Sequence, residues 1–286
     1  NDSCMYVHRS RSVVDACLLN EAIMSADTVA SAPIRQSRRG GTGHQTWNSA
    51  HILAGVLLEL EAKEYEAQAP LVSSDMRAKK HQSRCVLELG AGTGQLAVKL
   101  AMSGWRGILS TDGDSAVVRN MKYNVQANRV GHAVRCLKWD WEETCPKGLK
   151  LDEVDLVIGS DLVYYNRAHA MLASVLYTIL TSRPVEDLRP PPKALLLCCL
   201  RQAHDDGAGQ VSHHLSSEGY DGSSMQRFIE AELPNRGLLA RDLPISSEVF
   251  DALDDSSARE ALASTRARSC YRLYEVLLDT KTLGGA

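Results

Sequence analysis

Residues 85–94 read CVLELGAGTG, an apolar run that meets three glycines within five residues. The short apolar run indicates a strand, and glycines directly after it allow a sharp turn that brings a ligand against bare peptide. Helical spacing predicts a helix over residues 95–102, immediately after the glycines. In a parallel α/β sheet this first strand-to-helix turn is the usual contact with a ligand, so the stretch constrains both fold class and site.

The alternation of strand and helix continues along the chain. Further strands are predicted at residues 107–111, 132–137, 154–159 and 193–200, and further helices at 50–67, 114–128 and 167–181. Beyond Leu200 the pattern weakens to a helix over 225–233, a strand around 238–243 and a last strand over 271–278. Strands that alternate with helices indicate a doubly wound α/β fold, in which helices cover both faces of a parallel sheet.

Length and composition fit one such domain. A chain of 286 residues, 44% of them hydrophobic, can bury a sizeable core. The first forty residues are locally basic, which is typical of a solvated tail. We therefore expect a partly mobile N-terminal extension over residues 1–42 and one domain over residues 43–286. The polar stretch 246–268 either contacts a substrate or has no role in binding.

Cysteine usage, charge and hydropathy argue against several function classes. Cys85, Cys198 and Cys199 lie inside apolar runs and the sequence contains no CxxC, as expected of reduced thiols in a cytosolic or nuclear protein. The eight cysteines and nine histidines do not pair at the spacing of a zinc site, so no metal is expected. A net charge of −3 does not favour nucleic acid, and no apolar run approaches the roughly 20 residues of a membrane span. We expect a monomer in the cytoplasm.

The glycine loop, GAGTG at 90–94, differs from the phosphate-binding loops. A nicotinamide site has the pattern GxGxxG, which requires glycine where this chain has Gln95. A Walker-type loop requires a Lys-Ser or Lys-Thr pair after the glycines, and none follows. The loop therefore favours a ligand without a diphosphate, and a tight turn that serves only packing is the alternative.

Two acids narrow the choice of ligand. Glu88 lies in the strand before the loop, where a carboxylate repels a pyrophosphate and suits a cation. Asp112 ends the second strand about 20 residues past the first glycine, the position from which an acid accepts hydrogen bonds from ribose hydroxyls. Alternatively, Asp112 and Gly113 only form a turn. In either case we expect Asp114 to cap the next helix, since Asp112 lies too early for that position. A ribose-bearing cation without a diphosphate describes S-adenosylmethionine.

Further candidate site residues lie near other strand ends. Trp139 follows the third strand, where its ring either flanks an adenine or packs in the core. Asp161 and Tyr164 follow the fourth strand, three residues apart, and both can face an incoming nucleophile there. Trp47 precedes the helix at 50–67 and by itself would be a core residue or a hydrophobic staple of that helix.

Together these stretches resemble the seven-β-strand methyltransferases, and among them the eukaryotic lysine methyltransferase family. The resemblance is carried by QTWNSAHILA, VLELGAGTG, STDGD with NMKYNVQAN, LKWDWEE and DLVIGSDLVYY, in this order between Gly43 and Tyr165. Most methyltransferases share GxGxG, whereas Trp47 combined with DLVY at 161–164 is much more specific. The resemblance implies an α/β, doubly wound, mostly parallel seven-stranded Rossmann-like sheet whose last strand is antiparallel.

The resemblance also implies how the cofactor, S-adenosyl-L-methionine, is bound. Its methionine end would lie under Trp47 and above the loop of Gly90, Ala91, Gly92 and Gly94. Glu88 would help to hold the amino group through the loop, and Asp112 would take the ribose hydroxyls. Trp139 would lie at the adenine. Ser160, where family members often carry alanine, would contribute backbone near the sulfonium.

The implied reaction is methyl transfer to a lysine side chain of a protein, with Asp161 and Tyr164 as the catalytic pair at the substrate mouth. Family members modify elongation factor 2, calmodulin and chaperones. Thr46-Trp47 and LKWD resemble the elongation factor 2 and calmodulin enzymes, the first more closely, so we expect a translation factor as substrate. Nucleobase or arginine transfer would need a Pro-Pro-aromatic motif or a glutamate pair after the fourth strand, and both are absent. A small-molecule methyltransferase and an inactive cofactor-binding interaction module stay open.

Overall fold

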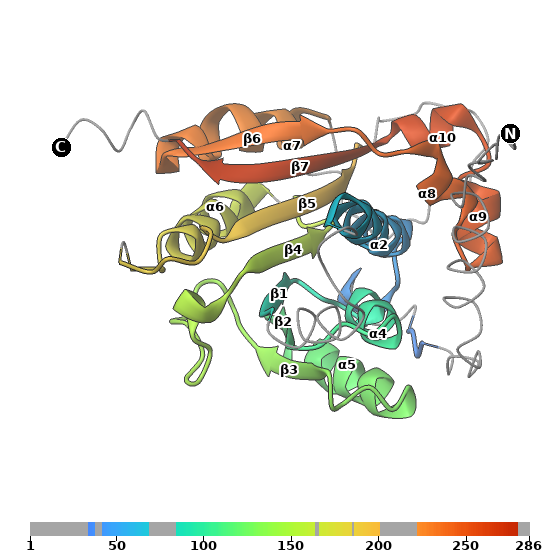
Figure 1. Cartoon of the computed structure of the whole chain (residues 1–286), viewed down its shortest axis with the longest axis horizontal. Coiled ribbons are helices and arrows are strands. Elements are labelled where there is room, and N and C mark those ends of the chain that lie inside the picture. Colours follow the sequence, from blue (N-terminus) through green and yellow to red (C-terminus); the bar gives the residue numbers. More distant parts are fainter. Residues whose placement is uncertain are drawn as a thin grey trace, which may run out of the picture. The chain divides into compact units, whose positions relative to one another are not determined.

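The computed structural model describes residues 34–37, 42–68, 84–163, 166–184, 186–200 and 222–279. All of them belong to one compact unit, Ile34–Ala286. Its centre is a seven-stranded sheet, whose strands are labelled in Figure 1. The strands are β1 (Val86–Leu89), β2 (Ile108–Asp112), β3 (Val134–Lys138), β4 (Leu156–Ser160), β5 (Lys193–Cys199), β6 (Leu238–Leu243) and β7 (Tyr271–Leu278).

The strand order is β3-β2-β1-β4-β5-β7-β6. Strands β1 to β5 are parallel to one another, and β7 runs antiparallel to both β5 and β6. The predicted doubly wound sheet with an antiparallel last strand is therefore confirmed. The chain runs outward from β1 to β3 and then returns to β4 beside β1. Such a reversal opens a crevice at the carboxyl ends of these two strands, which is where open α/β sheets bind ligands.

The helices agree with the predicted pattern to within a few residues, except after β5. The longer ones are α2 (Asn48–Gln68), α4 (Gln95–Met102), α5 (Ser115–Ala127) and α6 (Asn166–Leu180). The helix predicted at 225–233 is two pieces, α7 (Gly222–Arg227) and the π-helical segment η3 (Phe228–Glu232). The remaining short helices are η1 (Thr42–His44), η2 (Leu151–Glu153), η4 (Pro234–Arg236), α8 (Ser247–Asp251), α9 (Ser256–Ala261) and α10 (Thr265–Ser269).

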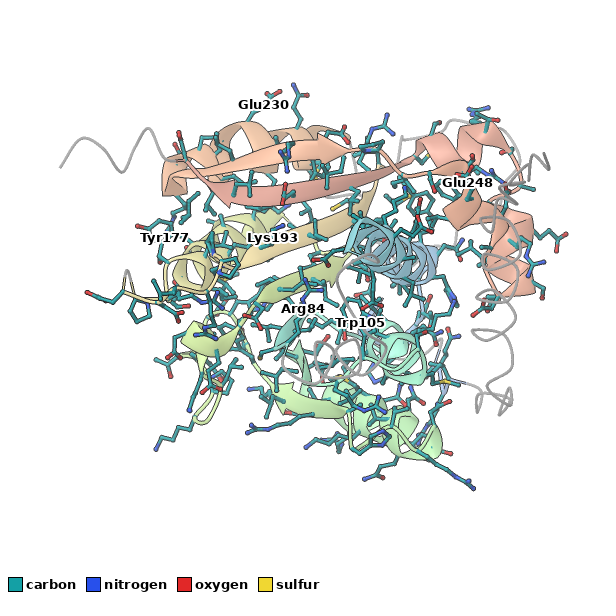
Figure 2. The ribbon with its side chains drawn as sticks, viewed as in Figure 1. Arg84, Trp105, Tyr177, Lys193, Glu230 and Glu248 are labelled. Atoms are coloured by element: carbon teal, nitrogen blue, oxygen red, sulfur yellow. The ribbon has the colours of Figure 1, made fainter. Side chains whose placement is uncertain are left out.

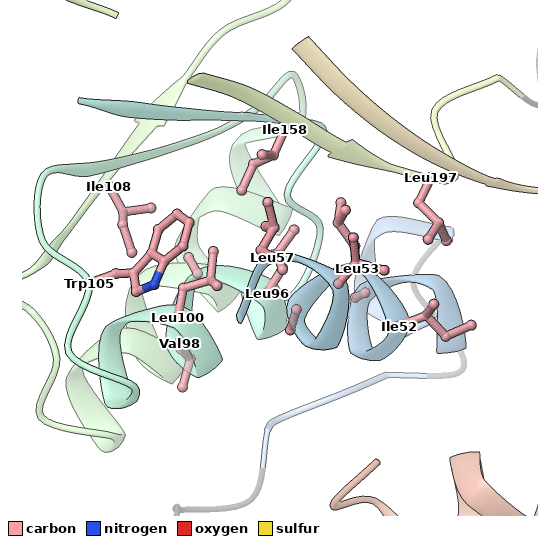
Figure 3. Packing of buried hydrophobic residues seen from close by; sticks show 14 of the residues in the cluster. Ile52, Leu53, Leu57, Leu96, Val98, Leu100, Trp105, Ile108, Ile158 and Leu197 are labelled. Carbon is pink, nitrogen blue, oxygen red and sulfur yellow. The ribbon is translucent and has the colours of Figure 1, made fainter. Parts of the chain in front are cut away.

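The two faces of the sheet have separate cores, because successive side chains of a strand point to opposite faces. Val86 of β1 joins the core under α2 and α4, whereas its neighbour Leu87 joins the core under α6 and η3. Figure 3 shows the first core, where Leu53 of α2 packs near Leu96 of α4 and Leu197 of β5. Helices cover both faces, as strand–helix alternation predicts.

The polar stretch at 246–268 belongs to this first core. Val249 and Phe250 of α8 are buried there, and Lys99 of α4 pairs with Asp254 at 3.1 Å. The stretch at 246–268 therefore serves packing.

At the amino-terminal end of the sheet, the Arg84 guanidinium lies 6.0 Å from the ring centroid of Trp105, and Figure 2 labels both residues. Within the described ranges, no helix is long and apolar enough to cross a bilayer.

Candidate cofactor site

A cavity of about 530 Å³ lies at the point where the strand order reverses. Its volume is within the usual range for small-molecule and cofactor sites. Eight of the residues predicted to form the site line it: Trp47, Gly90, Ala91, Gly92, Asp112, Trp139, Ser160 and Asp161. Residues far apart in the sequence are thus brought to one place by the topology.

Three predicted site residues are not found in the lining. Gly94 has a φ of 78° at the start of α4, and a Cβ there would lie 2.7 Å from Cγ of Met121. Gly94 therefore serves the turn and the packing against α5. Glu88 is buried beneath the loop, as shown below. Tyr164, the second predicted catalytic residue, lies outside the described residues.

The glycine loop needs its glycines for both backbone shape and space. Gly90 has a φ of 57°, in the region that residues with a Cβ rarely adopt. A Cβ on Gly90 would lie 2.5 Å from Cδ2 of Leu162, and one on Gly92 would lie 3.3 Å from the carbonyl oxygen of Gly43. The loop is therefore packed on its own chain on one side and borders the cavity on the other.

Asp112 fixes this loop to the end of β2. Its Oδ2 accepts the Gly92 N–H at 3.1 Å, and its Oδ1 accepts the Asp114 N–H at 3.1 Å. Asp114 itself caps α5, as predicted, by accepting the Ala116 N–H at 2.6 Å. Burial is the main cause of the raised pKa of Asp112. A carboxylate has room for about four hydrogen bonds, so Asp112 can still accept from a ligand in the cavity.

Glu88 has a different position from Asp112. Glu88 lies on β1 and is only 2% exposed. Its Oε2 accepts a hydrogen bond from the hydroxyl of Ser110, on the neighbouring strand β2, at 2.6 Å. Burial raises the pKa of the Glu88 carboxyl to about 8, so the group is mostly neutral at pH 7. Its link to the loop is indirect: the Thr111 hydroxyl donates to the Glu88 carbonyl, and the Ala91 N–H donates to the Thr111 carbonyl.

This burial makes protein stability depend on pH, which can be tested with Glu88→Gln. The folded protein holds the Glu88 proton more tightly, with a pKa of about 8 against about 4.5 unfolded, so the free energy of unfolding falls as pH rises between these values. Glutamine cannot titrate. We expect Glu88→Gln to gain stability over the wild type between pH 6 and 8, by up to about 1 kcal/mol per pH unit.

Urea unfolding at pH 6 and at pH 8 measures the free energy of unfolding of the variant and of the wild type. The exposed Glu153→Gln on η2 is the control, because it removes a carboxylate of the same type without removing a buried one. Parallel stability profiles of Glu88→Gln and wild type would show that Glu88 does not titrate in this range.

Trp139 packs in the second core, as one of its two alternatives predicts, and it also lines the cavity. Its place at the adenine stays a prediction. Trp47 lines the cavity as well, and its Nε1 donates to the Thr42 carbonyl at 3.3 Å. Trp47 is half-buried and belongs to neither core. Its place over the methionine end of the cofactor stays a prediction from the resemblance.

Asp161 is held in place from two sides. Its φ is 54°, unusual for a residue with a Cβ, although aspartate and asparagine tolerate this region better than most. Oδ1 accepts the Cys199 N–H at 2.8 Å, and Oδ2 accepts the Ser49 hydroxyl at 3.0 Å. The carboxylate therefore joins the ends of β4 and β5 to the first turn of α2 while it lines the cavity.

The charge of the cavity follows from its lining. Four carboxylates contribute, from Asp112, Asp140, Glu142 and Asp161, and the described lining residues include no lysine, arginine or histidine. Without a basic group, a diphosphate would be repelled, whereas a cation would be attracted. The interpretation of the glycine loop and the electrostatics of the cavity agree.

Sequence reasoning missed part of the lining. Thr42, Gly43, Gln95, Asp140, Trp141, Glu142, Ala168 and Met171 are among the lining residues that were not predicted. For Asp140 to Glu142 a signal was present, because they continue the LKWDWEE stretch beyond Trp139. Gln45 and Thr46 likewise had a signal, because they begin the QTWNSAHILA stretch. The contributions of α6 and of Thr42 depend on tertiary packing, for which the sequence has no comparable signal.

The known proteins to which this chain is similar are methyltransferases. A family model described as lysine methyltransferase matches residues 29–206, more than half of the chain. The protein N-terminal and lysine N-methyltransferase EFM7 of Cryptococcus neoformans is 31% identical over 159 residues, 52% of this chain and 46% of that protein. Its namesake in Schizosaccharomyces pombe is 31% identical over 137 residues, 45% of this chain and 47% of that protein.

The chain thus spans about half the length of the curated relatives that it matches. Among solved structures, the CcbJ methyltransferase from Streptomyces caelestis has a TM-score of 0.50 and 12% identity, covering 84% of this chain and 93% of that one. This likeness concerns the fold alone. The family match extends over the glycine loop, Asp112, Trp139 and Asp161, and this protein is therefore a member of the lysine methyltransferase family.

Proposed function

We propose that this protein transfers a methyl group from S-adenosylmethionine to a lysine side chain of a protein substrate. The observation that carries the proposal is the acidic cavity at the strand reversal, which has four carboxylates and, among its described lining residues, no basic side chain. Both the cofactor and the substrate amine bring positive charge to such a site. Its shape and charge favour a sulfonium over a nucleotide diphosphate.

The residues present fit the cofactor. Asp112 offers a fixed carboxylate for ribose hydroxyls, because two backbone N–H groups already hold it in place. The α4 amino terminus, which has no side-chain cap, begins directly after the loop and would suit the carboxylate of the methionine part. Trp139 would border the adenine, and Trp47 would cover the methionine end. Glu88 would act only through the loop, since its carboxyl is buried.

When bound, the sulfonium supplies an activated methyl group, so the protein needs to align and desolvate the amine. Asp161 would attract and orient the lysine ammonium as it enters, since its carboxylate is fixed at the cavity. A free lysine has a pKa of about 10.4, so one proton must leave before attack. A carboxylate such as Asp161 is a weak base at neutral pH, and the proton would pass to water. We assign Tyr164 to the shape of the channel on the resemblance alone.

The finer identity of the substrate is also part of the proposal. The motifs at Thr46-Trp47 and 137–140 favour a translation factor, with elongation factor 2 first. The names of the relatives add a second amine, because EFM7 is called a protein N-terminal and lysine N-methyltransferase. A monomeric state and a cytoplasmic location stay predictions from the sequence.

A labelling experiment tests the proposal. The recombinant full chain is incubated with methyl-labelled S-adenosylmethionine and, in parallel, elongation factor 2, calmodulin, a chaperone and a cytosolic extract. Label in a protein band, located to a lysine by mass spectrometry, is the expected result. Label on an N-terminal amine would change the acceptor, and label confined to the small-molecule fraction would overturn the proposal.

A further inference from the structure

Two asparagines of the stretch NMKYNVQAN have no role in the site described so far. Asn120 and Asn124 lie one helical turn apart on α5, and they are 9% and 0% exposed. Burying a side-chain amide is costly unless its donors and its acceptor are paired. Their partners therefore explain why these residues are present.

Asn124 pairs with the main chain of Arg35. The Arg35 N–H donates to Oδ1 of Asn124 at 2.8 Å, and Nδ2 of Asn124 donates to the Arg35 carbonyl at 3.2 Å. Asn120 donates to the same carbonyl at 2.9 Å, and the Arg35 guanidinium lies 5.1 Å from the ring centroid of Tyr123. The amide of Asn124 thus occupies both main-chain polar groups of residue 35, as a neighbouring β-strand would.

Asn124 also reaches the glycine loop. Its Nδ2 donates to the Thr93 carbonyl at 2.9 Å in a buried hydrogen bond. The hydroxyl of the same threonine lies 3.0 Å from the hydroxyl of Thr46. The buried amide of Asn124 therefore connects residue 35 to the glycine loop. Thr93, the loop residue that it binds, also contacts Thr46, which lines the cavity.

Residues 34–37 and 42–47 form one unit, which we call the N-terminal strap. The Ser37 N–H donates to the His44 carbonyl at 2.9 Å, and the Thr46 N–H donates to Oε1 of Gln36 at 3.0 Å. Five strap residues line the cavity: Thr42, Gly43, Gln45, Thr46 and Trp47. The segment that Asn124 anchors is therefore joined to the segment that closes one side of the cavity.

We propose that Asn124 is a positioning residue that seats the N-terminal strap against the glycine loop and thereby retains S-adenosylmethionine in the cavity. This inference rests on the proposed function, which names the cofactor. Only an amide can accept from one peptide group and donate to two carbonyls at this place. A carboxylate of the same shape would lose both donations and face the carbonyls of Arg35 and Thr93 with an oxygen.

The first test compares Asn124→Asp with Gln126→Glu. Both change an amide to a carboxylate on α5, but Gln126 is exposed. We expect Asn124→Asp to raise the dissociation constant and the KM for S-adenosylmethionine about 10-fold or more, through faster dissociation. The kcat at saturating cofactor should stay within about 3-fold, because the hydrogen bonds that hold Asp161, from Ser49 and Cys199, do not involve Asn124. Gln126→Glu should change neither constant by more than about 2-fold.

A second pair of variants does not change α5, so it tests the strap inference even if Asn124→Asp does not fold. Arg35→Pro removes the guanidinium and the N–H that donates to Asn124, whereas Arg35→Ala removes the guanidinium alone. We expect the KM for the cofactor to rise several-fold more in the proline variant than in the alanine variant. Trypsin cleaves after exposed arginines such as Arg35, and in the wild type we expect it to cut there more slowly when the cofactor is present.

Calorimetry with S-adenosylmethionine separates the two proposals. If the wild type binds the cofactor while Asn124→Asp or Arg35→Pro binds it as tightly as its control, the strap inference is wrong and the proposed function stands. If the wild type does not bind the cofactor, the proposed function fails and the strap inference fails with it. A loss of kcat with an unchanged KM for the cofactor also contradicts the strap inference, because it indicates damage to the substrate side.

Discussion

Replacing Asp112 with asparagine should raise the dissociation constant of S-adenosylmethionine about 100-fold, the largest effect that we expect on cofactor binding. The carboxylate lines the cavity and is oriented by the N–H groups of Gly92 and Asp114. Asparagine keeps the shape but has one acceptor oxygen, so one of these N–H groups loses its partner. Ribose hydroxyls would also lose hydrogen bonds to a charged acceptor, each worth about 1.5–3 kcal/mol.

Calorimetry measures the loss, and Asp114→Asn provides a matched control. Asp114 is an acid two residues away that caps α5 and does not line the cavity. Asparagine is as good a cap as aspartate, so both stability and cofactor affinity should stay close to those of the wild type. Equal affinity of the Asp112→Asn variant and the control would show that Asp112 only forms a turn.

The fold could be predicted because its signals are local and repeated. The strand at β1 and the helix at α4 were predicted from apolar runs, and the glycines between them mark the turn. The region after β5 was harder, because the helix predicted at 225–233 is divided into α7 and the π-helical η3, a change of helix type that apolar spacing does not indicate. Likewise, the polar composition of 246–268 hides Val249 and Phe250, which pack into the core under α2.

The site could be predicted only in part, since sequence position does not reveal where a side chain points. Glu88 and Asp112 both lie in strands beside the loop, yet Glu88 is buried against Ser110 while Asp112 lines the cavity. Which side chain reaches the cavity depends on its place at the strand end, and that is set by the register between β1 and β2. The strap's anchor on Asn124 joins residues 89 positions apart, a contact that no local pattern predicts.

For the substrate side, Asp161→Asn should lower kcat/KM for the protein substrate about 100-fold while cofactor affinity changes by no more than about 3-fold. Asparagine tolerates the φ of 54° and keeps an oxygen for the Cys199 N–H. Its Nδ2 can donate to the Ser49 hydroxyl oxygen, so α2 stays attached to β4. The variant therefore removes the negative charge and little else, and a rate loss reports the attraction of the lysine ammonium.

Alanine at position 161 is the less informative change, because it combines several effects. It loses the hydrogen bonds to Ser49 and Cys199, and alanine tolerates left-handed backbone less well than aspartate does. We therefore expect reduced stability as well as reduced rate. Asp152→Asn on η2, exposed before the amino-terminal end of β4, controls for the loss of one negative charge. Single-turnover methylation with saturating cofactor measures the chemical step directly. Full wild-type rates in an Asp161→Asn variant that binds the cofactor would mean that Asp161 anchors α2 and that another group receives the lysine.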